Sequence, residues 1–121
     1  MTAADIQQLR EQVNAAADRL RSLSLASLAS PTAPGERSRA AAALAVAQLL
    51  ADLDAVVREK PSDVPADDDV VYAGEAAVGD QIAVIGRELA AALEGMDRAD
   101  PSTAAVCTAA TDAVAALRME L

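Results

Sequence analysis

Hydrophobic side chains recur every three or four residues in four stretches of the chain, the spacing of one face of an α-helix. Segments 30–35, 61–65 and 95–101 separate these stretches, and their proline and glycine residues disfavour helix interiors. The pattern predicts helices over residues 1–29, 36–60, 70–94 and 101–121. In the first stretch the apolar stripe is Ile6, Leu9, Val13, Ala16, Leu20 and Leu23.

The second and fourth stretches carry stripes of the same kind. In residues 36–60 the predicted core stripe is Ala42, Val46, Leu49, Leu53 and Val56, widened by Leu50 and Val57. A row of small residues runs beside it: Ala40, Ala47, Ala51 and Ala55. In residues 101–121 the stripe is Val106, Ala110, Ala113, Leu117 and Leu121. Both stretches therefore predict helices that are apolar on more than one side.

Helix starts and ends have signals of their own. Thr2 with Asp5 suits a capping hydroxyl followed by an acid in the first turn. Asp100 followed by Pro101 is a good start for the last helix, because proline is well tolerated at the first helical position. Gly95 stands where the third helix would be capped at its C-terminus.

Residues 70–94 allow two interpretations. Their main stripe is Val71, Gly74, Val78, Ile82, Ile85, Leu89 and Leu93, which predicts a helix. Val70–Tyr72 and Ile82–Ile85 are rich in β-forming residues, and glycine within a helix costs roughly 1 kcal/mol, so a β-hairpin is the alternative. We favour the helix because the three–four spacing continues to Leu93.

A chain of 121 residues is suited to one domain. Short connections between helices favour antiparallel neighbours. The sequence therefore predicts an all-α fold: a single domain spanning residues 1–121, arranged as an up-down-up-down four-helix bundle.

The predicted helices carry more apolar surface than such a bundle needs to bury. Part of this surplus has a simple explanation, because alanine is the best helix former and needs no partner. Glycine lowers helix stability, so Gly79 and Gly86, two turns apart on one face, indicate close packing against another backbone. That backbone belongs either to residues 36–60 or to a second subunit. We predict a homodimer through the helices at 70–94 and 101–121, with an interface at Gly79, Ala83, Gly86 and Ala90.

Composition excludes several chemistries. The chain has no histidine, tryptophan or phenylalanine, and one cysteine. These absences exclude Ser–His–Asp catalysis, Cys/His zinc sites and disulfides within the chain, and they remove base-stacking aromatic platforms. The net charge of −9 opposes nucleic-acid binding. All of that excess lies in residues 61–121, with three basic and twelve acidic side chains. It is either a solubilising surface or a surface for a basic partner.

Few residues are candidates for a site. A groove lined by Val78, Ile82, Ile85 and Leu117, with Glu75 beside it, is the predicted site for a small apolar ligand. Glu75 either pairs with Arg39 or reaches water at the rim. Asp67–Asp69 are expected to cap a helix, because they lack the pattern of a cation loop. Cys107 has no base nearby in sequence and is expected to be a small buried hydrophobe.

The functional prediction follows from these exclusions. Residues 1–5 lack a basic segment followed by an apolar one, and the longest uncharged apolar run, residues 40–51, is shorter than the roughly 20 residues of a membrane span. We expect a cytoplasmic, non-enzymatic interaction or accessory protein that acts as a homodimer, without cofactor, metal, nucleic acid or membrane. The alternatives are a bundle that binds a small apolar ligand and, third, a carboxylate enzyme using Glu75 and Asp80 with a hard metal ion.

Overall fold

The computed structural model describes residues 1–58 and 74–121, with only the backbone of Glu75 included. Over these ranges the chain is helical and has no strand, which confirms the all-α prediction. The helices are α1 (Ala3–Ser22), α2 (Leu25–Ala29), α3 (Arg39–Val57), α4 (Val78–Glu94) and α5 (Pro101–Glu120). A 3₁₀ turn, η2 (Glu75–Ala77), precedes α4.

The predicted helix caps are present. The hydroxyl of Thr2 accepts a hydrogen bond from the Asp5 amide at 3.2 Å, and the Asp5 carboxylate accepts one from the Thr2 amide at 2.8 Å. Asp100 accepts from the Ser102 amide at 2.9 Å and Pro101 opens α5. Gly95 caps the end of α4. The side chains of Thr2, Asp5 and Asp100 accept from backbone N–H groups that a helix N-terminus leaves without partners.

Two helix boundaries differ from the predictions. The stretch 1–29 is divided, because Leu23 is extended and Ser24 caps a new helix by accepting from the Ser27 amide. The helix predicted to begin near residue 70 begins at Val78, after Gly74, which has a φ of +98°. The hairpin alternative is wrong for Ile82–Ile85, which are helical. Its other half, 70–72, lies outside the described residues.

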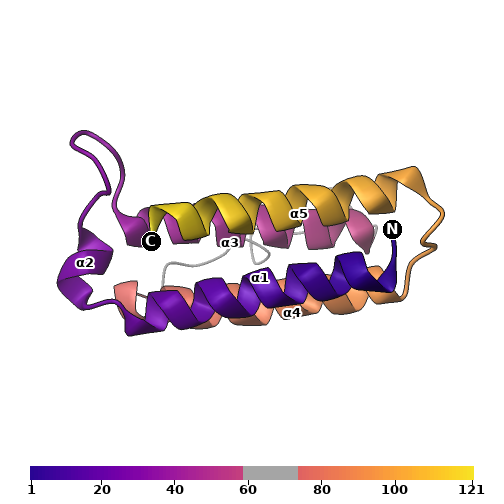
Figure 1. Ribbon diagram of the computed structural model, residues 1–121, viewed down its shortest axis with the longest axis horizontal. Coiled ribbons are helices and arrows are strands. Elements are labelled where there is room, and N and C mark those ends of the chain that lie inside the picture. Colours follow the sequence, from indigo (N-terminus) through magenta and orange to yellow (C-terminus); the bar gives the residue numbers. More distant parts are fainter. Residues whose placement is uncertain (59–73) are drawn as a thin grey trace.

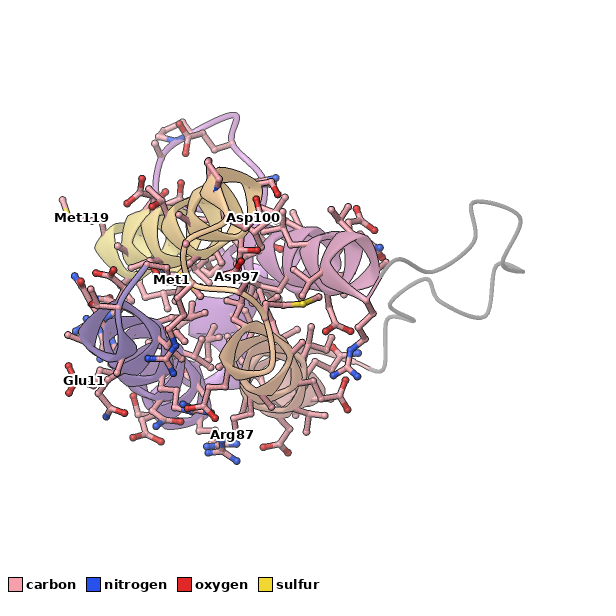
Figure 2. The ribbon with its side chains drawn as sticks, turned by 90° about the vertical axis from the view of Figure 1, so that its right-hand side faces the viewer. Met1, Glu11, Arg87, Asp97, Asp100 and Met119 are labelled. Carbon is pink, nitrogen blue, oxygen red and sulfur yellow. The ribbon has the colours of Figure 1, made fainter. Side chains whose placement is uncertain are left out.

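The four long helices lie side by side, and each packs mainly against two others (Figure 1). Helix α1 contacts α4 and α5, and helix α3 contacts the same two. Viewed along the helices in Figure 2, α1 and α3 are diagonal to each other, as are α4 and α5. Helices joined by the connections at α2 and at residues 95–100 are therefore not packing partners.

The predicted up-down-up-down alternation of direction is wrong. Arg10 bonds Glu94 and Arg21 bonds Asp80, so α1 and α4 are antiparallel. Helices α3 and α4 run in the same direction, as do α1 and α5 (Figure 1). The prediction assumed short connections. The fifteen residues from 59 to 73 can reach about 50 Å, whereas the 17 residues of α4 span about 26 Å. The length of this connection therefore does not require antiparallel neighbours.

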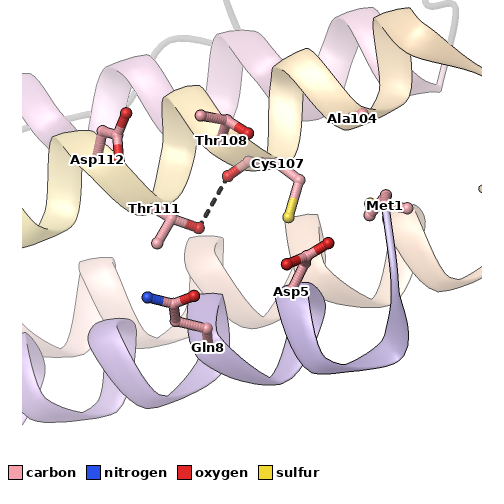
Figure 3. Close-up of a pocket in the computed structure, with 8 residues that line it drawn as sticks. All are labelled: Met1, Asp5, Gln8, Ala104, Cys107, Thr108, Thr111 and Asp112. Carbon is pink, nitrogen blue, oxygen red and sulfur yellow. Dashed lines mark hydrogen bonds between the residues drawn. The ribbon is translucent and has the colours of Figure 1, made fainter.

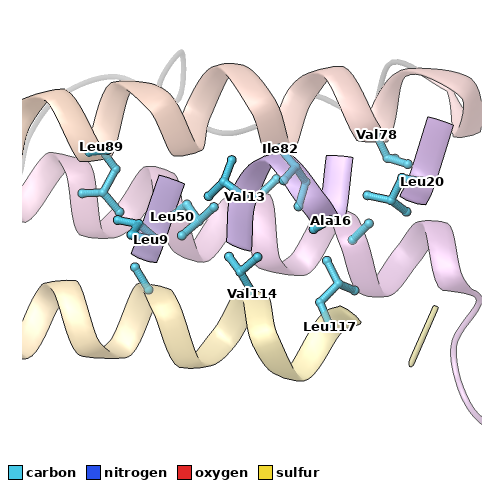
Figure 4. Close-up of a cluster of buried hydrophobic side chains, with 14 of the residues drawn as sticks. Leu9, Val13, Ala16, Leu20, Leu50, Val78, Ile82, Leu89, Val114 and Leu117 are labelled. Atoms are coloured by element: carbon cyan, nitrogen blue, oxygen red, sulfur yellow. The ribbon is translucent and has the colours of Figure 1, made fainter. Parts of the chain in front are cut away.

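The predicted stripe of α1 forms one side of the core (Figure 4). Its members Leu9, Val13 and Ala16 are completely buried. Large side chains of α4 meet them in the centre, where Ile82 and Leu89 are also completely buried. Eight of the ten largest fully buried side chains of the described residues thus belong to α1 and α4.

Helix α3 is rotated about its own axis relative to the prediction, so a different side of it is buried. Its buried residues are Ala40, Ala42, Ala43, Ala47, Leu50, Asp54 and Val57. Two members of the predicted core stripe are instead exposed, Leu49 by 39% and Val56 by 65%. In the predicted row of small residues, Ala40 and Ala47 are buried and Ala51 and Ala55 are half-buried, so this side of α3 lies nearer the interior. Alanine fits there because the larger side chains of α1 and α4 already occupy the centre.

The glycines of α4 pack against α1 of the same chain. A Cβ atom at Gly79 would lie 3.1 Å from the Ala17 carbonyl oxygen, and one at Gly86 would lie 2.6 Å from a methyl carbon of Val13. The predicted close approach exists, but its partner is neither residues 36–60 nor a second subunit. The predicted interface residues Gly79, Ala83, Gly86 and Ala90 are all buried within one chain. A second copy has no access to that face while α1 is in place.

The Gly86 contact yields a first prediction. Gly86→Ala would place its Cβ 2.6 Å and 2.7 Å from the two methyl carbons of buried Val13. We expect a net loss of about 1–2 kcal/mol in the free energy of unfolding, because overpacking outweighs the roughly 1 kcal/mol gain in helix propensity. Urea unfolding measures the change.

Gly95→Ala is the matched control, since its Cβ would have only the Ala92 carbonyl oxygen nearby, at 3.6 Å. Adding Val13→Ala to Gly86→Ala should restore part of the loss through a favourable coupling. A Gly86→Ala variant as stable as the parent would show that the α1–α4 contact is not tightly packed.

Candidate functional site

The outward sides of α1 and α4 are rich in charge. Glu11 of α1 and Arg87 of α4 point into solvent in Figure 2. Arg21 pairs with Asp80 at 2.7 Å, so ion pairs cross between the two helices. This side of the molecule is a well-hydrated surface.

A second ion pair joins Arg10 and Glu94 at 2.6 Å. The hydrogen bond from Arg10 lowers the pKa of the Glu94 carboxyl, and the same bond raises the pKa of the Arg10 guanidinium. The Arg10 and Glu94 side chains are 29% and 48% exposed, and ion pairs that water reaches contribute little to stability.

The outward sides of α3 and α5 are different in character. On α3 the exposed residues of Arg39–Val57 are Ala41, Ala45, Leu49, Asp52 and Val56. On α5 the row that repeats at the same spacing is Ala105, Ala109, Asp112, Ala116 and Met119. Each row follows the three–four spacing of a single helical face. Each contains one acidic residue among apolar ones.

Exposed and half-buried apolar side chains also line the boundary between α3 and α5. With about 100° of rotation per residue, Asp52 and Asp112 turn away from this boundary, whereas valines, leucines and alanines turn toward it. We call this surface the α3/α5 face. Its members are exposed or half-buried. They are Val46, Leu49, Leu53 and Val56 from α3, and Ala105, Val106, Ala109, Ala113 and Ala116 from α5.

Charged groups appear at the two ends of the α3/α5 face. At one end Val56 and Val106 line a depression of about 190 Å³ together with Asp97 and Asp100. At the other end Arg39 donates hydrogen bonds to the carbonyl oxygens of Glu120, Ser27 and Ser30. The sequence pattern pointed to much of this surface, but assigned it to the core.

The structure does not bring the predicted ligand-binding residues together around a groove. Val78, Ile82 and Leu117 are at most 2% exposed and belong to the packed core. Ile85 lies elsewhere, on an open depression of about 350 Å³ that is also lined by Val84. The side chain of Glu75 lies outside the described residues, so its predicted contact with Arg39 is not defined.

The pocket beside Cys107 does not provide a nucleophile (Figure 3). Cys107 is 3% exposed, and burial raises the pKa of its thiol, with a further increase from the Asp5 carboxylate. A thiol with a raised pKa stays protonated at neutral pH, and the protonated form is a poor nucleophile. The described residues also contain no group of three acidic or sulfur side chains able to hold a metal ion.

Helix α3 has the length and apolar composition of a membrane-spanning helix. By length and composition alone, this 19-residue helix could cross a membrane. Helices in the cores of soluble proteins also satisfy this criterion, and 44% of the residues in the apolar window are buried by other helices. This finding alone does not assign α3 to a membrane.

Comparison with known proteins gives no further assignment. No family model, curated protein or solved structure matches the chain. The choice of a candidate site therefore rests on the geometry alone, and the α3/α5 face is that candidate.

The buried thiol yields a second prediction. In the native protein Cys107 should react with a thiol-specific disulfide reagent at pH 8 at least about 100-fold more slowly than in guanidinium chloride, because reaction requires opening of the α1–α5 contact. The absorbance of the released thiolate measures the rate. Equal rates in native and unfolded protein would contradict the burial of Cys107.

Proposed function

We propose that this chain is a non-enzymatic interaction protein, a four-helix bundle that works as a homodimer. The observation that carries the proposal is the exposure of Leu49 and Val56 on a side of the molecule where the exposed residues are mostly apolar, with polar Asp52, Thr108, Asp112 and Glu120 among them. Contiguous exposed apolar patches on soluble domains are most often sites of association.

The contrast between the two sides supports this proposal. Helices α1 and α4 expose charged side chains that are joined by ion pairs, so their outward sides are suited to contact with water. Helix α3 has no charged residue from Ala40 to Ala51. Exposed leucine and valine on such a helix lose favourable burial of up to about 2–3 kcal/mol per side chain unless another surface covers them.

A binding role, in preference to catalysis, is supported by the available side chains. The chain has no histidine, and burial raises the pKa of its one thiol. Asp80, offered above as part of a carboxylate pair, forms an ion pair with Arg21. Each of these observations favours an accessory or scaffolding role.

Sedimentation equilibrium of the full chain tests the homodimer. Between about 1 and 100 μM we expect the weight-average mass to approach twice the 12.3 kDa of the chain, the range in which weak to moderate dimers form. Light scattering on the same samples is an independent check. A single 12.3 kDa species at the highest concentration would overturn the proposal.

A second candidate function is the binding of a small apolar ligand on α4. The depression at Ala77, Val84 and Ile85 has a volume within the range of small-molecule pockets. A medium-chain fatty acid at ten times its dissociation constant should stabilise the native state by about 1.4 kcal/mol, seen as a rise in Tm. Val84→Asp should remove this rise. No rise with either protein would exclude this site.

A further inference from the structure

We infer that the α3/α5 face is covered by the same face of a second copy of this chain, related by a two-fold axis beside Leu49, with the two α3 helices antiparallel. This inference rests on the proposed homodimer and adds which surface associates and in what orientation. The sequence pattern predicts an interface on the glycine side of α4 instead, and α1 covers that side.

Charge is the first argument for a second copy as the occupant. Each chain carries a net charge of −9, so two copies repel each other wherever their charged surfaces meet. The members of the α3/α5 face are uncharged. This face therefore lets like molecules approach, whereas a basic partner would be attracted to the acidic surfaces elsewhere. The interiors of homodimer interfaces are also more apolar than those of transient complexes.

The size of the face is the second argument. Helices α3 and α5 contain 19 and 20 residues, so each is about 30 Å long. Two such helices about 9 Å apart present roughly 500 Å² in projection, and more as a corrugated molecular surface. That is of the order of the roughly 800 Å² that each subunit buries in a stable complex.

The distribution of charge along the face favours the antiparallel orientation. Asp97 and Asp100 lie beside Val56 at one end, and exposed Arg37 precedes α3 at the other. A parallel pair would place both aspartates opposite their own copies and would bring the two Asp52 side chains to the same height. The antiparallel pair separates these acids and brings Asp97 and Asp100 toward Arg37 of the partner subunit. Opposite charges attract, so this orientation has the lower electrostatic energy.

Leu49 is the expected position of the two-fold axis. It lies at the middle of α3, which spans Arg39–Val57, and is 39% exposed. An axis there lets the two α3 helices overlap along their whole length. The leucine of each copy then packs against its equivalent, while Val56 of one copy lies beyond the reach of Val56 of the other.

Cysteine cross-linking tests both the face and the orientation. In a Cys107→Ala background, Leu49→Cys should form a disulfide-linked dimer under mild oxidation, because Cα atoms near a two-fold axis come within the 4.4–6.8 Å that a disulfide requires. Val56→Cys should not, since antiparallel symmetry separates the two residues by fourteen positions, or about 21 Å along the helix. Val84→Cys, also exposed and apolar but on α4, is the matched control.

Charge substitution is the second measurement. Leu49→Asp should raise the dimer dissociation constant at least about 100-fold, because the two-fold axis places both carboxylates in one apolar contact. Val84→Asp should change the dissociation constant less than about threefold. Circular dichroism at a concentration where all variants are monomeric shows whether each remains folded, which the exposure of both side chains predicts.

The outcomes separate this inference from the proposed function. A dimer that cross-links at Leu49→Cys but not at Val56→Cys or Val84→Cys, and that Leu49→Asp dissociates, supports both. Cross-linking at both Leu49→Cys and Val56→Cys would overturn the antiparallel orientation. A dimer unaffected by Leu49→Asp would overturn the face while leaving the homodimer intact. A monomer that co-floats with anionic phospholipid vesicles would overturn both, with the membrane as the occupant.

Discussion

The contact between Gly86 and Val13 determines how the rest of the molecule is arranged. Glycine in a helix lowers stability unless something uses the space it leaves, and here both methyl groups of a completely buried valine use it. This contact fixes which side of α4 faces α1. Ile82 and Leu89 are then directed into the centre, and little volume remains for α3. Helix α3 fills that volume mainly with alanines, together with Leu50 and Val57, whereas its Leu49 and Val56 are exposed.

Several local features of the fold could be predicted from the sequence. Helix α1 has polar residues opposite its apolar stripe, so its buried side follows from the pattern. The caps at Thr2, Asp100 and Gly95 depend on residues that are close in sequence, so they could be predicted from the sequence as well. Such features involve few long-range contacts, and a sequence pattern records them directly.

The rotation of α3 and the parallel direction of α3 and α4 could not be predicted in this way. Helix α3 has no charged residue between Ala40 and Ala51, so amphipathicity gives no direction to its buried side. The stripe with larger side chains was taken as the core, although core volume was decided by α1 and α4. Similarly, Gly79 and Gly86 indicate that a backbone comes close but do not identify which one. The sequence predicts surplus apolar surface on α3, α4 and α5, but the interface residues that it indicates on α4 are buried within the chain.

The diagonal placement of α1 and α3, and of α4 and α5, also affects how the chain folds. Since α1 and α3 are not packing partners, and neither are α4 and α5, these connections do not produce a helical hairpin that could form early and persist alone. The contacts that define the core join segments distant in sequence, such as Val13 with Gly86. Relative contact order is accordingly higher than in a bundle of sequential hairpins, and folding rates fall as contact order rises. The chain should fold as one cooperative unit, more slowly than a meandering helical protein of the same length.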